Sequence, residues 1–259
     1  SGVGILLQLA EKLKDTLKGS NYLLMAFSGE EMGLLGSNYF TKNPTIDLPK
    51  ASYMLNMDMV GRLRDANTLS ISGTGTSPIW NQVLNATNTD FKLVLSESGV
   101  GPSDHTSFYL QNIPALHFFT GQHADYHKPT DDSEKLNYEG MRMIEDYIIR
   151  IISELDDDAK LAFRTTKNES EDVPRFKVAL GVMPDYLFDG NGMRIDGVTE
   201  GRPADVAGLQ KGDVVIQMGD SLVTDMMSYM RVLSVFEEGN TTKVTVDRNG
   251  EKMEVKGKF

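Results

Sequence analysis

Apolar residues recur along the first part of the chain in two patterns, which predict alternating helices and buried strands. Residues 1–17 place them three or four positions apart, as in a helix with one buried face, and the expected face is Val3, Leu6, Leu7, Ala10, Leu13 and Leu17. Ser1 can cap this helix and Gly19 can end it. Residues 21–29, NYLLMAFSG, form an apolar run of strand length, which predicts a strand buried on both faces.

The alternation continues downstream. Further strands are predicted at residues 51–61, 68–73, 91–98 and 114–120, and further helices at about 31–40, 77–88, 104–112 and 137–158. Strands that alternate with helices in this way indicate an α/β domain with three layers.

The pattern changes beyond residue 160. The stretch RTTKNESEDVP, residues 164–174, is polar and charged and has no periodicity, which marks a linker. After it come short alternating strands separated by glycine turns, with one helix near residues 225–237, and these predict a small β-rich domain. The sequence therefore predicts an α/β domain over residues 1–160, a linker over 161–174 and a β-rich domain over 175–259.

Composition and charge exclude several classes of protein. At 40% hydrophobic and 24% charged, the 259 residues are those of a globular chain that can bury a core. The net charge of −11 provides no basic surface for nucleic acid or for anionic membranes. The chain has no cysteine, which excludes thiol catalysis, cysteine-bound zinc and disulfides. No apolar run approaches the ~20 residues that span a bilayer, so no membrane span is expected.

Acidic residues and histidines gather where predicted strands end. Glu30 and Glu31 follow the first strand, Asp58 interrupts the apolar stretch NMDMVGR, and His123 and His127 lie in HADYHKPTDD after the strand at 114–120. The ends of strands and the loops after them are where α/β sheets place their sites.

Each of these features also has a purely structural interpretation. The two glutamates can interact with a helix dipole, Asp58 can pair with nearby backbone or with Arg62, and loop histidines are usually solvent-exposed. A metal site accounts for all three features together, because carboxylate oxygen and imidazole nitrogen are the ligands that a catalytic zinc takes without cysteine. Adjacent glutamates can then divide the work, one binding the metal and one acting as general base.

Four motifs in this order, FSGEEMGLLGS, NMDMVGR, SDHTSF and YHKPTDD, resemble the zinc-dependent aminopeptidases of the bacterial leucyl aminopeptidase type. Their wider relatives include glutamate carboxypeptidase and glutaminyl cyclase. The resemblance covers about residues 1–157 and implies a mixed-sheet α/β fold with a two-zinc site. It implies that Glu30 is the general base, that Glu31 and His127 bind one zinc, and that Asp58 binds the other.

The resemblance also assigns the remaining polar residues of these motifs. Asp104 and His105, in SDHTSF, correspond to the family's substrate-pocket loop, where they either orient the substrate or serve a structural role. His117 lies within an apolar strand and is expected to be a core histidine. His123 is expected to lie near the metal without binding it.

The chain departs from the family at its start. The family has two further ligands upstream, a histidine in an H-x-D motif and an aspartate that bridges both metals, whereas this chain begins SGVGILLQ, without an initiator methionine, and Asp15 lies far along the first helix. A catalytic zinc takes three protein ligands. We therefore expect a processed or truncated chain that binds zinc weakly or not at all and lacks peptidase activity, while a longer parent protein is active.

Two further expectations follow from the same departure. Without the strands that begin the family's sheet, an edge and an apolar face would be exposed, which favours self-association. The family likeness also implies an extracytoplasmic location.

The β-rich part resembles a PDZ domain of the bacterial protease type. The stretches that carry the resemblance are VALGVMP, residues 178–184, and GRPADVAGLQKGDVVIQMGD, residues 201–220. It implies that the backbone N–H groups of Leu180, Gly181 and Val182 bind the C-terminal carboxylate of a peptide that adds as a strand. The alternative is a structural cap with an unused groove. Met226, Met227 and Met230 share one helical face and are expected in the core rather than on a binding surface.

Two functions from different classes remain open. The first is a metallo-aminopeptidase whose PDZ-like domain recruits peptide substrates. The second is a non-catalytic peptide-binding protein built on a peptidase scaffold. Glutaminyl cyclase-like or carboxypeptidase chemistry on the same scaffold is a third and weaker alternative.

Overall fold

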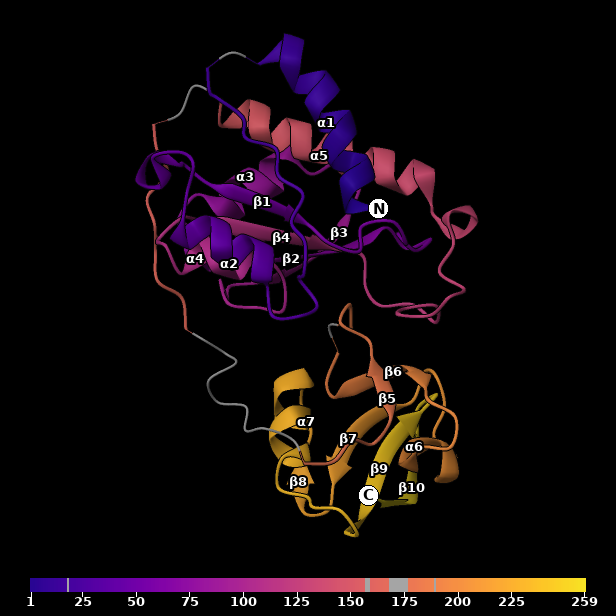
Figure 1. Cartoon of the computed structure of the whole chain (residues 1–259). Coiled ribbons are helices and arrows are strands. Elements are labelled where there is room, and N and C mark those ends of the chain that lie inside the picture. Colours follow the sequence, from indigo (N-terminus) through magenta and orange to yellow (C-terminus); the bar gives the residue numbers. More distant parts are fainter. Residues whose placement is uncertain (18, 157–158, 168–176, 189) are drawn as a thin grey trace. The chain divides into compact units, whose positions relative to one another are not determined.

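A computed structural model describes residues 1–17, 19–156, 159–167, 177–188 and 190–259 (Figure 1). Its internal contacts divide the chain into two units. The first unit contains Ser1–Thr120 and Asp132–Asn168, and the second contains Gly121–Asp131 and Glu169–Phe259. Each unit has its own hydrophobic core and is described separately below.

A four-stranded mixed sheet forms the centre of the first unit. Its strands, in spatial order, are β1 (Met54–Met57), β4 (Ala115–Phe119), β2 (Thr68–Ser72) and β3 (Lys92–Ser96). β1 and β4 are parallel, as are β2 and β3, while β2 and β4 are antiparallel. The predicted mixed sheet is therefore confirmed.

Helices cover both faces of this sheet (Figure 1). α1 (Gly2–Thr16), α3 (Trp80–Thr87) and α5 (Tyr138–Glu154) lie on one face, and α2 (Leu35–Lys42) and α4 (His105–Tyr109) lie on the other. Short 3-10 helices occupy Leu48–Lys50, Thr74–Thr76 and Ser133–Lys135. The main core lies under α1, α3 and α5 and includes Ile5, Leu9, Leu69, Ile71, Trp80, Phe118, Ile144 and Tyr147. These three layers confirm the predicted α/β architecture.

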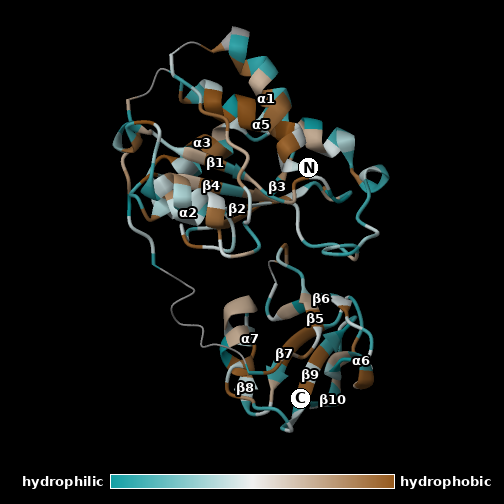
Figure 2. Ribbon diagram, in the orientation of Figure 1, coloured by the Kyte–Doolittle hydropathy of each residue, from teal (hydrophilic) through white to brown (hydrophobic). Residues whose placement is uncertain are grey.

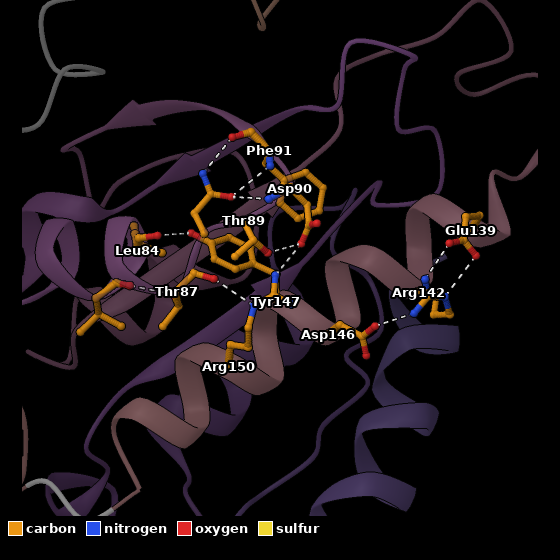
Figure 3. A network of polar contacts seen from close by, with 12 residues as sticks. Leu84, Thr87, Thr89, Asp90, Phe91, Glu139, Arg142, Asp146, Tyr147 and Arg150 are labelled. Carbon is orange, nitrogen blue, oxygen red and sulfur yellow. Dashed lines mark hydrogen bonds and ion pairs between the residues drawn. The ribbon is translucent and has the colours of Figure 1, made fainter.

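Polar contacts from α5 hold the connection between α3 and β3 in place (Figure 3). The hydroxyl of the fully buried Tyr147 donates to the Leu84 carbonyl at 2.8 Å. Arg150 donates through Nε to the Thr87 carbonyl at 2.9 Å and pairs with the Asp90 carboxylate at 2.7 Å. The C-terminal half of α5 is thus hydrogen-bonded to α3 and to the loop that follows α3.

The predicted apolar face of α1 is wrong in part. Ile5, Leu9 and Leu13 are the buried residues, whereas Val3 and Leu7 are 58% and 65% exposed. Apolar and polar residues follow one another closely along this helix (Figure 2), so the sequence offers two possible stripes. The stripe spaced four residues apart faces the core because the packing of α1 on α5 and β1 selects that side.

The predicted strand at residues 21–29 is also wrong. This segment pairs with no strand among the described residues, although its side chains are by turns exposed and half-buried. Met25 and Phe27 pack against the small core under α2 and α4, while Leu23 and Leu24 are 51% and 38% exposed. An apolar run becomes a strand only where a neighbouring strand supplies hydrogen bonds, and β1 pairs here with β4.

The second unit contains an antiparallel sheet in the order β10, β9, β7, β6, β5. The strands are β5 (Val182–Pro184), β6 (Met193–Val198), β7 (Val214–Met218), β8 (Ser221–Leu222), β9 (Thr241–Arg248) and β10 (Glu251–Lys258), with β8 paired to β7. Two helices accompany them, α6 (Pro203–Val206) and α7 (Met226–Leu233). Met226 and Met230 are half-buried against the core, as expected, whereas Met227 is half-buried but is not among the residues packed against it. The predicted β-rich domain is confirmed.

Part of the expected linker packs against the first unit. Arg164 N donates to the Thr76 carbonyl at 2.8 Å, and Thr166 N donates to the Tyr109 hydroxyl at 2.9 Å. Leu161 is buried in the main core. The remainder of that linker, residues 168–174, lies outside the described residues. None of the helices described is both long and apolar enough to cross a membrane.

Candidate active site

The two adjacent glutamates lie in a closed turn that precedes α2. The Glu30 carbonyl accepts from Gly33 N at 3.0 Å and from Leu34 N at 2.8 Å. The helix begins only at Leu35, so the prediction that it starts near residue 31 is wrong. Because the turn comes first, Glu30 is half-buried and Glu31 is exposed, and neither occupies the first turn of the helix.

Asp58 follows β1 and joins a line of polar side chains. Its amide donates to the Phe118 carbonyl at 3.3 Å, which extends the pairing of β1 with β4 by one residue. Its carboxylate accepts from the Ser103 hydroxyl at 3.0 Å, and Ser103 in turn accepts from the Asn56 side chain at 2.8 Å. The structure therefore brings Asp58 to the loop that carries Asp104 and His105.

Asp104 occupies the N-cap position of α4, where its side chain makes no capping hydrogen bond, and it is only 8% exposed. Burial raises the pKa of this carboxyl, the nearby Asp58 carboxylate raises it further, and a hydrogen bond from Ser37 opposes the change. Its Oδ1 atom has no hydrogen-bond partner among the described residues. The charged forms of Asp104 and Asp58 therefore disfavour one another.

His105 and His117 stack on one another, with ring centroids 4.8 Å apart and planes 19° apart. Both are buried, at 0% and 8% exposed. Burial lowers the pKa of His105 well below its usual value and lowers the pKa of His117 to about 4, the latter against the opposing effect of Asp58. Both ring nitrogens of His105, and Nε2 of His117, have no partner among the described residues.

Asn56, Ser103 and His117 contribute to this cluster although none of them was predicted to be a site residue. Asn56 and His117 are directly opposite one another in the parallel β1–β4 pair, and both interrupt apolar strands. Polar residues inside two apolar strands could have identified them from the sequence, because a core contains such groups only where they have hydrogen-bond partners or a function. His117 is thus in the core strand, as predicted, but its ring belongs to the polar cluster.

The second histidine motif lies in the segment Gly121–Asp131, which groups with the second unit. His127 stacks on Tyr126 with centroids 3.7 Å apart, and His123 Nε2 lies 3.8 Å from an Asp131 carboxylate oxygen. Thr130 donates to Asp125 at 2.7 Å within the same loop. Within the first unit the fold thus brings together Asp58, Asp104 and His105.

Left-handed backbone conformations mark the same motifs. Six non-glycine residues among those described have positive φ, and three of them are asparagines, which adopt this conformation readily. The other three are Leu34 (φ 58°) after the paired glutamates, Met59 (φ 50°) after Asp58, and His127 itself (φ 55°). Such strain persists where the surroundings demand it, and it is concentrated at functional sites.

Zinc is the metal that the sequence motifs imply. The donors have the right chemistry, since carboxylate and imidazole bind zinc, and the unpartnered nitrogens of His105 and His117 are buried near Asp58. However, no group of three or more His, Asp or Glu side chains in the described part of the chain is arranged to hold a metal ion. The residues present therefore do not fit a complete zinc site.

The loop before β5 contains a glycine in the left-handed region of backbone conformation. Gly181 has φ 81°, and a Cβ added there would lie 2.2 Å from the Arg202 Cβ, so only glycine fits. The carbonyls of Leu180 and Gly181 accept from Ala204 N and Thr199 N at 2.8 and 2.9 Å. The amides of Leu180 and Gly181 donate to no other described residue.

Comparisons with known proteins agree with this description. Residues 1–152 match Peptidase family M28 and residues 160–258 match the PDZ domain. Aminopeptidase YwaD of Bacillus subtilis (strain 168) is 26% identical over 165 residues, which cover 60% of this chain and 36% of that protein. A solved zinc aminopeptidase from Bacillus subtilis is 24% identical with a TM-score of 0.53, covering 62% of this chain and 43% of that one.

The chain spans less than half the length of either relative. Of its 259 residues, 152 match one family, and the mixed sheet with helices on both faces agrees with that assignment. The chain therefore belongs to Peptidase family M28, with a PDZ domain after its peptidase part.

Proposed function

We propose that this chain is part of an aminopeptidase that hydrolyses the N-terminal peptide bond of peptides. The observation that carries the proposal is the cluster of Asp58, Asp104 and His105, in which the buried Asp104 and His105 have polar atoms without a partner among the described residues. The aminopeptidase names of the relatives support the same reaction class.

The proposed roles follow the motifs. In a completed site Glu30 would act as general base, and Glu31, Asp58 and His127 would be ligands of two zinc ions, since the relative of known structure is a zinc aminopeptidase. Asp104 and His105 orient the substrate.

We further propose that the chain of 259 residues binds zinc weakly and has little activity alone. Support comes from the described residues, among which no three His, Asp or Glu side chains are arranged around one point. Calorimetric titration with zinc should show no tight binding. Two tight sites in such a titration would contradict this proposal.

An activity assay tests the reaction class. In the longer parent protein, release of p-nitroaniline from leucine p-nitroanilide should depend on zinc, be abolished by chelator, and fall at least 10²-fold in Glu30→Gln. The matched control is Glu11→Gln, on the exposed side of α1, which should retain activity. Release that is insensitive to chelator would refute a metallopeptidase.

A second candidate function is peptide binding without catalysis. The incomplete set of metal ligands favours it, and the second unit retains an open sheet edge beside the loop at residues 180–182. In either case we propose that Leu180, Gly181 and Val182 bind the C-terminal carboxylate of a peptide through their amides. The amides of Leu180 and Gly181 make no other hydrogen bond to described residues, which supports this role. Binding of free-acid peptides but not of their C-terminal amides would support this.

Two expectations remain proposals with direct tests. Self-association through the unpaired stretch 21–27 is supported by its exposed Leu23 and Leu24, and sedimentation equilibrium should show a dimer that Leu23→Lys disrupts. An extracytoplasmic location rests on the family likeness, and fractionation of the source cells tests it.

A further inference from the structure

The edge strand of the second unit carries a proline at a position that faces outward. β5 pairs with β6 and with no other described strand, so its second side is open, directly after the loop at 180–182. Its three residues are Val182, Met183 and Pro184. Which of their backbone groups face the open side follows from the pairing with β6.

The register determines these directions. Gly181 O accepts from Thr199 N at 2.9 Å, and Val182 is directly opposite Val198, one step further along. Paired residues in an antiparallel ladder alternate between hydrogen-bonded and non-hydrogen-bonded positions. Val182 therefore occupies a non-hydrogen-bonded position, and its N–H and C=O face outward.

The same reasoning applies beyond the bulge between Met183 and Pro184. Asp185 N donates to Arg194 O at 2.8 Å, so the preceding residue, Pro184, faces outward again. Its opposite residue, Ile195, confirms this, because its N–H and C=O bond instead to Asp213 and Gly212, both at 2.8 Å. The outward side of β5 thus offers N–H and C=O at Val182 but only C=O at Pro184, since proline has no N–H.

A peptide that adds antiparallel, with its carboxylate at the 180–182 loop, would place its last residue opposite Val182. Its third residue from the end would then be opposite Pro184. The N–H of that residue can donate to Pro184 O, but its C=O meets no donor. The opposite edge of the sheet discourages strand addition for another reason, because β10 exposes the charged residues Lys252, Glu254, Lys256 and Lys258.

We propose that Pro184 is a specificity-determining residue that shortens peptide recognition by the second unit. The unit recognises the terminal carboxylate and the last residue, and the carbonyl of the third-last residue remains solvated. Peptide C-termini are therefore bound weakly and released quickly. This inference rests on the proposed binding of C-terminal carboxylates by the loop at 180–182.

The test adds the missing donor. In Pro184→Val the whole chain gains one outward N–H, which should tighten binding about three- to tenfold, as expected for one exposed hydrogen bond. Pro184→Ile is a second variant with the same donor. Met183→Val is the matched control, since it adds a β-branched residue to the same strand while the backbone of residue 183 faces β6.

The probe comes from a library of random heptapeptides with free C-termini, selected on the wild-type chain and on Pro184→Val. The best binder is labelled with fluorescein and measured by fluorescence polarisation. A second version of it replaces the amide between the third-last and second-last residues by an ester, which makes the third-last carbonyl a weaker acceptor. We expect the ester to remove the gain of Pro184→Val and to change wild-type binding less than twofold.

The outcomes distinguish the role of Pro184 from the binding of peptide C-termini. Equal affinities of the wild type, Pro184→Val and Pro184→Ile, or a gain that survives the ester, would overturn the role of Pro184 and leave C-terminal recognition standing. A gain in Met183→Val of the same size would also overturn it. If no heptapeptide is retained by any of the proteins, the proposed binding of C-termini fails, and the inference fails with it.

Discussion

Substitution of Gly181 by alanine should destabilise the second unit for two separable reasons. The residue has φ 81°, and left-handed backbone costs a non-glycine residue about 1–2 kcal/mol. The new Cβ would also lie 2.2 Å from the Cβ of Arg202, which forces the loop or α6 to move, and overpacking of this kind costs about 1–3 kcal/mol. The expected loss in the free energy of unfolding is therefore about 2–5 kcal/mol.

A control variant and a rescue variant isolate the steric part. Gly208 has φ 77° but no described atom within 4 Å of a built Cβ, so Gly208→Ala should lose only the backbone contribution of about 1–2 kcal/mol. Arg202→Gly removes the clashing atom, and position 202 is the N-cap of α6, where glycine is tolerated. In that background Gly181→Ala should cost no more than Gly208→Ala does.

Hydrogen exchange measured by mass spectrometry on the whole chain provides the assay. Peptides from β9 and β10 report the stability of the second unit. The fluorescence of Trp80, the only tryptophan and fully buried in the first unit, should not change. Equal losses in Gly181→Ala and Gly208→Ala, or no rescue by Arg202→Gly, would refute the close approach of residues 181 and 202.

Three further predictions concern single side chains. Tyr147→Phe removes the buried donor to Leu84 O and should lower the first unit's stability by about 1–2 kcal/mol in urea, whereas Tyr138→Phe, 60% exposed, should change it by less than about 0.5 kcal/mol. Asp225→Ala removes the capping box of α7 and should cost the second unit about 1 kcal/mol by hydrogen exchange; no loss would contradict the cap. Burial lowers the pKa of His117 from 6.5 to about 4 in the folded chain. As pH falls, the unfolded chain is therefore protonated at this residue before the folded chain is. In metal-free buffer the free energy of unfolding should therefore be highest above pH 6.5 and fall by up to about 3 kcal/mol as pH drops to 4. His117→Gln should reduce this pH dependence.

Local patterns in the sequence predicted the fold well where an element depends mainly on its own residues. The periodicity of residues 137–158 predicted a helix, and α5 occupies Tyr138–Glu154. The apolar run at 114–120 became β4 because it is buried between two strands that hydrogen-bond to it. The run at 21–29 has similar composition but no ladder partner, and strand formation is a property of the pair rather than of the run.

Candidate site residues could be identified only by type and order along the chain. The sequence indicated Glu30, Glu31 and Asp58 because acids after apolar strands require an explanation, and the structure joins Asp58 to the loop of Asp104 and His105. The contribution of His117 depends on its stacking on His105, a contact between residues twelve positions apart on different elements. No local pattern encodes such a contact.

The sequence by itself determined the two-part organisation, the types of nearly all helices and strands, and the motifs of both families, because these depend on composition and short-range periodicity. Tertiary structure alone decided which face of α1 is buried, which apolar run remains unpaired, and that Pro184 faces the open edge of its sheet. Each of these depends on register or on a neighbouring element, and a shift of one residue would reverse the direction of every backbone group along β5.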